Sequence, residues 1–147
     1  MQRSNYVCGI VTLLIVVFLL TVGVLMKNSL TLSSFMLLTL VGPLVIVAIM
    51  SFINGWLNPT ALVKVIGFNI IIVLAIDIIM LIFTKTFFSS KEFINRLNSM
   101  SQNSAVHIYI GGIGNIITGL FIFIIIAALF SFIGSKVGNK NLRKGGK

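Results

Sequence analysis

Apolar residues occur along this chain in four long, continuous runs that short polar stretches separate. A helix rises 1.5 Å per residue, so about 20 apolar residues cross the roughly 30 Å hydrocarbon core of a bilayer. Runs that are continuous rather than alternating favour helices over the strands of a transmembrane barrel. The pattern therefore predicts an all-α, polytopic membrane protein. The four predicted transmembrane helices cover about residues 6–26, 35–53, 65–83 and 108–133.

The longest polar interval lies between the third and fourth runs, over residues 84–107. Ser89 and Glu92 have the spacing of a helix-capping box, and Phe88 and Phe93 have the spacing of a hydrophobic staple. This pattern predicts a short amphipathic helix that lies on the membrane surface, and the alternative is an ordinary loop with a few apolar residues. The apolar residues on one face of the predicted helix are Phe93, Ile94, Leu97 and Met100.

Composition points to lipid as the main solvent, because 58% of the residues are hydrophobic and only 9% are charged. A soluble domain carries about 25% charged residues. The eleven Lys and Arg lie mostly between or after the apolar runs, as in membrane proteins, and form no basic helical face for nucleic acid. With both termini in the cytoplasm, seven basic residues lie inside and four outside. We therefore predict a multi-pass protein of the cell membrane with both termini cytoplasmic.

The chain divides into a predicted transmembrane domain, residues 1–134, and a basic tail, residues 135–147, that we expect to be disordered. Five positive charges in the tail favour anionic lipids of the inner leaflet. The first apolar run is longer than a signal-peptide core and lacks a small-x-small cleavage site, so we expect an uncleaved helix. Cys8 is the single cysteine, which excludes an intrachain disulfide.

Asp77 is an acidic residue inside the third predicted transmembrane helix. A carboxylate there costs roughly 2.5–3.5 kcal/mol on insertion scales, so it should face protein or water. It could hydrogen-bond between helices, or it could bind a cation or relay a proton, and both interpretations stay open. Counted along ideal helices, each of the four predicted helices places one polar side chain at a similar depth. These four residues are Thr21, Thr39, Asp77 and Asn115.

Several small residues lie at the start of the fourth predicted helix, and they would let the backbone of another helix approach closely. A phosphate-binding loop is disfavoured, because no strand precedes the glycines and no Lys-Ser/Thr pair follows them. In the second predicted helix, Gly42 and Pro43 lie in mid-span and predict a kink. The candidate packing glycines are Gly111, Gly112, Gly114 and Gly119.

The sequence contains no motif typical of catalysis, of a metal site or of a cofactor. His107 stands alone, and neither an HExxH motif nor paired carboxylates occur. We therefore expect a non-enzymatic membrane protein that acts through helix packing with itself or with a membrane partner, as an accessory subunit or an immunity-type protein does. One alternative is a small oligomeric ion channel or transporter that uses Asp77. Another is a phage-type holin, by analogy of size and charge alone.

Overall fold

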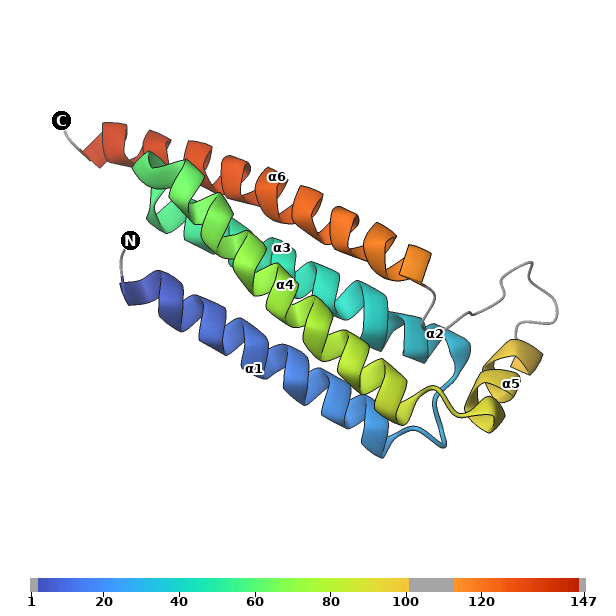
Figure 1. Ribbon diagram of the computed structural model, residues 1–147. Helices are drawn as coiled ribbons and strands as arrows, with labels where there is room; N and C mark the ends of the chain where they lie inside the picture. The colour runs from blue at the N-terminus through green and yellow to red at the C-terminus, as the bar shows by residue number, and fades with distance from the viewer. Residues whose placement is uncertain (1–2, 101–112, 146–147) are drawn as a thin grey trace.

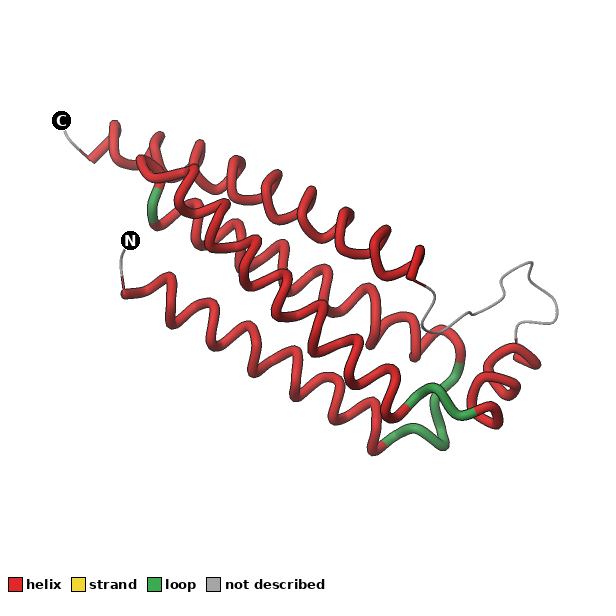
Figure 2. Tube along the Cα trace, viewed as in Figure 1, coloured by secondary structure: helices red, strands yellow, loops and turns green. Residues whose placement is uncertain are grey.

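The computed structural model describes the backbone of residues 3–100 and 113–145, and the side chains of residues 5–100 and 117–142. The long helices lie side by side in one bundle (Figure 1). Figure 2 shows that short turns connect most of them. In chain order the elements are α1 (Arg3–Leu25), α2 (Leu32–Met36), the π-helix η1 (Leu37–Val41), α3 (Gly42–Leu57), the 3-10 helix η2 (Pro59–Ala61), α4 (Leu62–Phe87), α5 (Lys91–Met100) and α6 (Ile113–Gly145).

Within the described chain, four helical segments are long and apolar enough to cross a membrane. The prediction of an all-α membrane protein with four spans is therefore confirmed. The N-terminal end of α1 and the C-terminal end of α6 lie at one end of the bundle (Figure 1). The helix α5 lies at the other end, which we call the α5 end. The four segments are Asn5–Leu25, Leu32–Leu57, Pro59–Phe87 and Ile117–Leu142.

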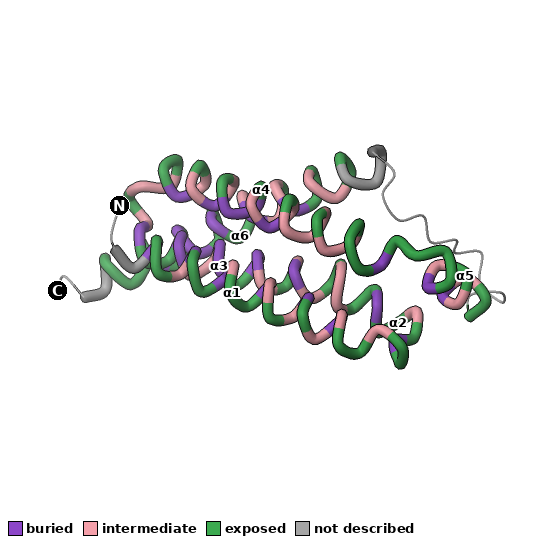
Figure 3. Tube along the Cα trace, turned by 60° about the horizontal axis from the view of Figure 1, so that its bottom comes forward, coloured by how far each residue is buried: buried purple, intermediate pink, exposed green. Residues whose placement is uncertain are grey.

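The main core is a cluster of apolar side chains to which all four spanning segments contribute. Buried residues follow the inward faces of the helices, while the outward faces are exposed along their length (Figure 3). Phe18 is 70% exposed and Val63 is 84% exposed. Such faces are costly in water but not against lipid tails. The buried members of the main core are Val16, Leu20, Val47, Met50, Ile72, Val73, Ile76, Phe123 and Ala127.

The helix α5 confirms the predicted amphipathic helix, and in Figure 1 it runs across the direction of the bundle. The predicted staple is present, because the ring centroids of Phe88 and Phe93 lie 5.3 Å apart. The predicted capping box is wrong, because the Ser89 hydroxyl donates back to the carbonyl oxygen of Lys85. The helix begins at Lys91, and the Ile94 N–H donates to the carbonyl oxygen of Ser90 at 3.1 Å. The aromatic cluster that holds α5 consists of Leu30, Phe35, Phe88, Phe93 and Leu97.

The sixth helix extends far beyond the predicted end of the fourth span. It continues to Gly145, so the prediction of a disordered tail is wrong for residues 135–145. Contacts with the end of α3 explain the extension. A Cβ at Gly138 would overlap the carbonyl oxygen of Trp56, and the Ser135 hydroxyl donates to the carbonyl oxygen of Pro59 at 2.9 Å. These contacts stabilise the helix in a segment whose glycines and charged residues do not by themselves favour helix formation.

The π-helix η1 lies directly before Gly42 and Pro43, where the sequence predicts a kink. The Gly42 N–H donates to the carbonyl oxygen of Leu37, five residues earlier, instead of four. Pro43 has no N–H to donate, so the regular α-helical ladder is interrupted at this point in any case. A wider turn restores the hydrogen bonding without ending the helix.

Candidate functional site

The predicted polar layer does not join the helices through its two threonines. The Thr21 hydroxyl donates to the carbonyl oxygen of Val17, and the Thr39 hydroxyl donates to that of Phe35, each at 2.8 Å within its own helix. A threonine in an apolar helix commonly satisfies its hydroxyl in this way, four residues back along the chain. The prediction of an interhelical role is therefore wrong for Thr21 and Thr39.

Asp77 and Asn115 do not lie at the same height in the bundle. The Asn69 amide donates to the Ser131 hydroxyl at 2.9 Å, which aligns α4 with α6 at that level. Asp77 is eight residues beyond Asn69, or about 12 Å, whereas Asn115 is sixteen residues before Ser131, or about 24 Å. The side chain of Asn115 itself lies outside the described residues.

Asp77 is half-buried and lies directly after the buried Ile76, at the margin of the inward face of α4. Among the residues that the structure describes, none gives the Asp77 carboxylate a hydrogen bond or an ion pair. This carboxylate therefore lies in a spanning helix and has no hydrogen-bond or ion-pair partner among the described residues. Its position allows contact with a group outside the chain.

The largest set of buried polar side chains lies at the opposite end of the bundle from α5. The Asn54 amide on α3 donates to Asn69 Oδ1 on α4 at 2.7 Å, and Asn69 donates in turn to Ser131 on α6. The Ser131 hydroxyl then donates to the carbonyl oxygen of Ala127 at 2.6 Å. Asn54, Asn69 and Ser131 are fully buried. One continuous chain of hydrogen bonds thus joins three spanning helices.

A second branch of this network adds the first helix. Asn58, in the turn after α3, donates to Asn5 Oδ1 on α1 at 2.7 Å, and its amide also lies 3.4 Å from the carbonyl oxygen of Asn54. Asn5 is fully buried and Asn58 nearly so. All four spanning helices therefore meet through neutral polar groups. We call this end, defined by Asn5, Asn54, Asn58 and Asn69, the asparagine end.

Glycines allow α3 and α6 to approach closely at the asparagine end. A Cβ at Gly55 would overlap the carbonyl oxygen of Ser131, and a Cβ at Gly134 would overlap that of Phe52. The predicted packing glycines behave differently. Gly119 has no atom within 4 Å of the position that a Cβ would take. Gly111 and Gly112 lie outside the described residues, and the surroundings of Gly114 are not described either.

Sequence reasoning missed the asparagine end because Asn54 and Asn58 resemble residues of a turn between two spans. The helix α3 continues to Leu57, so Asn54 is instead a helical residue whose side chain points into the bundle. A signal was present in α6, where Ala127, Ser131 and Ser135 recur at every fourth position. Small residues at that spacing are typical of close helix contacts in membranes.

Three atoms of the asparagine end are buried without a hydrogen-bond partner among the described residues: Asn5 Nδ2, Ser51 Oγ and Asn54 Oδ1. They include a donor, an acceptor and a hydroxyl that can be either, which is the set of groups that ordered water bridges. The network contains neutral amides and hydroxyls only. Its chemistry suits the positioning of helices rather than the transfer of protons.

The described residues contain no group of three or more His, Cys, Asp or Glu side chains that could hold a metal ion. His107 lies outside them. No protein-family model matches the chain, and no characterised protein and no solved structure shows significant similarity to it.

Proposed function

We propose that this protein is a non-enzymatic protein of the cell membrane that acts by associating with a further transmembrane helix. That helix belongs to a second copy of the chain or to a membrane partner, for which this protein serves as an accessory subunit or an immunity-type protein. The observation that carries the proposal is the half-buried carboxylate of Asp77, which lacks a partner in the described chain. An acid in a span costs roughly 2.5–3.5 kcal/mol, and a polar group of another helix reduces that cost.

Gly119 supports a helix contact in the same half of the bundle. It is half-buried on α6, and the space at its Cβ position is open. Gly119 lies twelve residues before Ser131, or about 18 Å, so its height differs from that of Asp77 by only about 6 Å. Small residues and polar side chains both favour the association of helices in lipid. The heights of the two residues support a contact between the middle of the bundle and the α5 end.

The proposed orientation has both termini in the cytoplasm, so that the asparagine end faces inward and α5 faces outward. The distribution of basic residues favours this arrangement by seven to four. Lys136 and Lys140 lie on the last turns of α6, where anionic lipids of the inner leaflet would attract them.

Two matched glycine variants test the association. Gly119 and Gly67 both have open space at the Cβ position, so leucine at either residue leaves the fold of the single chain intact. We expect Gly119→Leu to reduce association in lipid bilayers, measured by energy transfer between labelled copies or with a captured partner. Gly67→Leu, on α4 near the asparagine end, should leave association unchanged. Equal association of wild type, Gly119→Leu and Asp77→Leu would refute the proposal.

The same carboxylate favours one alternative, a small channel or transporter in which a cation or a proton is the partner of Asp77. Asp77→Asn separates the two functions, because an amide keeps hydrogen bonds but carries no charge. Under our proposal Asp77→Asn keeps the association and proteoliposomes show no flux that depends on Asp77. A cation or proton flux in wild-type proteoliposomes that Asp77→Asn abolishes would establish the alternative.

A further inference from the structure

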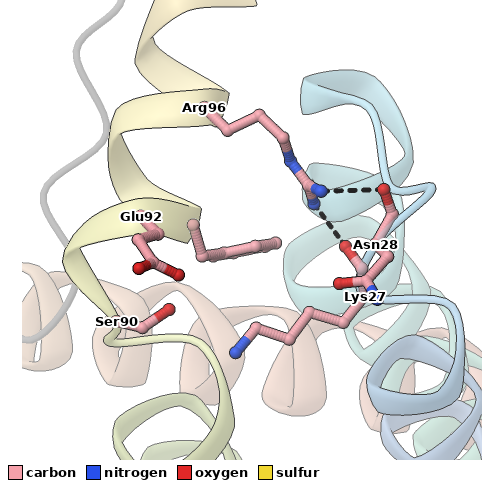
Figure 4. A pocket seen from close by; sticks show the side chains of 6 residues that line it. Lys27, Asn28, Ser90, Glu92 and Arg96 are labelled. Atoms are coloured by element: carbon pink, nitrogen blue, oxygen red, sulfur yellow. Dashed lines mark hydrogen bonds between the residues drawn. The ribbon is translucent and has the colours of Figure 1, made fainter.

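A cavity at the α5 end lies between the start of α5 and the turn that follows α1. Its volume is about 230 Å³. Figure 4 shows the side chains that line it, with Arg96 on one side and the Lys27 amine directed toward Ser90 and Glu92 on the other. The lining residues are Lys27, Asn28, Ser90, Glu92, Phe93 and Arg96.

Arg96 forms one wall of this cavity and is held firmly in place. Its guanidinium donates to the carbonyl oxygen of Asn28 at 2.7 Å and to that of Lys27, where the last carbonyls after α1 lack helical partners. It also lies over the Phe93 ring, 5.4 Å from the centroid. These contacts join α5 to the end of α1. They use Nη1 and Nη2 of Arg96 without neutralising its charge, and the buried Nε has no hydrogen-bond partner among the described residues.

Lys27 brings a second positive charge to the same ring, with its amine 5.5 Å from the Phe93 centroid. Among the described residues, neither Lys27 nor Arg96 forms an ion pair with a carboxylate. Two cations near one buried aromatic ring repel each other unless an anion lies close to both. The Ser90 hydroxyl adds a neutral donor on the side toward which Lys27 points.

The cavity lies just beyond the ends of two candidate spans, at the height expected for lipid head groups. The spanning segment of α1 ends at Leu25 and that of α4 ends at Phe87, so Lys27 and Ser90 follow these ends by two and three residues. The aromatic cluster beneath α5 contains Phe93 and packs against Val24 and Leu38 of two spanning segments. Lysine side chains at this level commonly extend into the head-group region.

Glu92 decides which head group fits. A carboxylate in the lining disfavours a purely anionic ligand but provides an acceptor for an amine. We propose that the cavity binds a phospholipid head group that carries both a phosphodiester and a primary amine, as phosphatidylethanolamine does. The phosphate contacts Lys27 and Ser90, with Arg96 contributing its charge, and the amine donates to Glu92. This site is independent of an association through Asp77 or Gly119.

Native mass spectrometry of the full chain in detergent micelles tests the site with equimolar phosphatidylethanolamine, phosphatidylcholine and phosphatidylglycerol of matched acyl chains. The wild type should retain phosphatidylethanolamine in preference to the other two. Lys27→Gln should reduce that retention roughly tenfold, as the loss of a charge-assisted hydrogen bond does, and Lys27→Arg should restore it. Glu92→Gln should lower retention of phosphatidylethanolamine to the level of phosphatidylcholine.

Lys91→Gln is the matched control, since Lys91 carries the same charge at the start of α5, between Ser90 and Glu92 in the sequence, but does not line the cavity. An equal loss in Lys91→Gln and Lys27→Gln would show unspecific attraction and overturn the proposal. Equal retention of the three lipids by the wild type would overturn it as well. Millimolar inorganic phosphate should not displace the lipid, and full displacement would identify a site for a free anion instead. The melting temperatures of all variants should stay close to that of the wild type, because the side chains of Lys27 and Glu92 form no hydrogen bond or ion pair between helices among the described residues.

Discussion

The two ends of the bundle are held together by different interactions. At the asparagine end, buried amides and hydroxyls link four helices, and glycines bring α3 and α6 into backbone contact. At the α5 end, five apolar side chains and the cap by Arg96 hold α5 against the turn after α1. Lipid tails are as apolar as the side chains that they would replace, so close packing and hydrogen bonds must hold helices within the bilayer. Aromatic burial is effective where water is near.

The largest expected effect comes from Gly134→Leu at the asparagine end. Any side chain there meets the backbone of Phe52, so α6 must move away from α3 and the amide network must separate. We expect a loss of at least about 3 kcal/mol of unfolding free energy, within the range of severe overpacking. Denaturation in mixed micelles, followed by circular dichroism, measures it. Gly119→Leu is the control, and equal stability of the two variants would contradict the backbone contact.

Asn69→Leu should have the next largest effect, because Asn69 accepts from Asn54 and donates to Ser131. Interhelical hydrogen bonds in membranes contribute about 0.6 kcal/mol each on average, and a buried amide left without an acceptor costs about 1–3 kcal/mol. We expect a loss of about 2 kcal/mol in the same measurement. Thr21→Val is the control, since its exposed hydroxyl bonds its own helix. A loss no larger than that of Thr21→Val would show that the network does not stabilise the bundle.

Phe93→Ala tests whether α5 is held independently of the spanning helices. Phe93 belongs to the aromatic cluster, which shares no member with the main core. We therefore expect faster amide exchange throughout α5, while exchange in α4 changes little and global stability falls by less than about 1 kcal/mol. Hydrogen exchange with mass spectrometry resolves the two helices. Faster exchange in α4 to the same degree would show that the two ends unfold as one unit.

The sequence predicted those features of the fold that hydropathy and periodicity determine along a single segment. The four spans and α5 belong to this class, since each depends on its own run of residues. The asparagine end depends on which way each helix is turned and on partners far apart in the chain, such as Asn5 and Asn58. The depth of a residue along its helix does not determine whether its side chain faces the bundle or the lipid. For this reason Thr21 and Thr39 were at plausible depths yet bond within their own helices.

The C-terminal segment, residues 135–147, is a second case in which local sequence does not determine the structure. Charges and glycines in residues 135–147 are typical of a flexible segment, and local propensity gives no reason to expect a helix. The helix forms because Gly134 and Gly138 fit closely against α3, and because Ser135 reaches Pro59. In this segment tertiary contacts determine the secondary structure, and a prediction from local sequence cannot include them.

The smallest expected effect separates charge from geometry at the α5 end, through Arg96→Lys. Arginine donates to two carbonyl oxygens with one planar group, whereas an ammonium is a point charge that favours one of them. The variant keeps the charge beside Phe93 but weakens the cap on the end of α1. We expect local destabilisation of about 0.5–1 kcal/mol, seen as faster amide exchange in residues 27–31 and 91–97.

The control for this variant is Lys91→Arg, which exchanges the same two residue types at an exposed position and should leave amide exchange in both segments unchanged. If Arg96→Lys exchanges as slowly as the wild type, the positive charge suffices and the paired hydrogen bonds add nothing. Faster exchange at the asparagine end, by contrast, would show that the two ends of the bundle are energetically coupled.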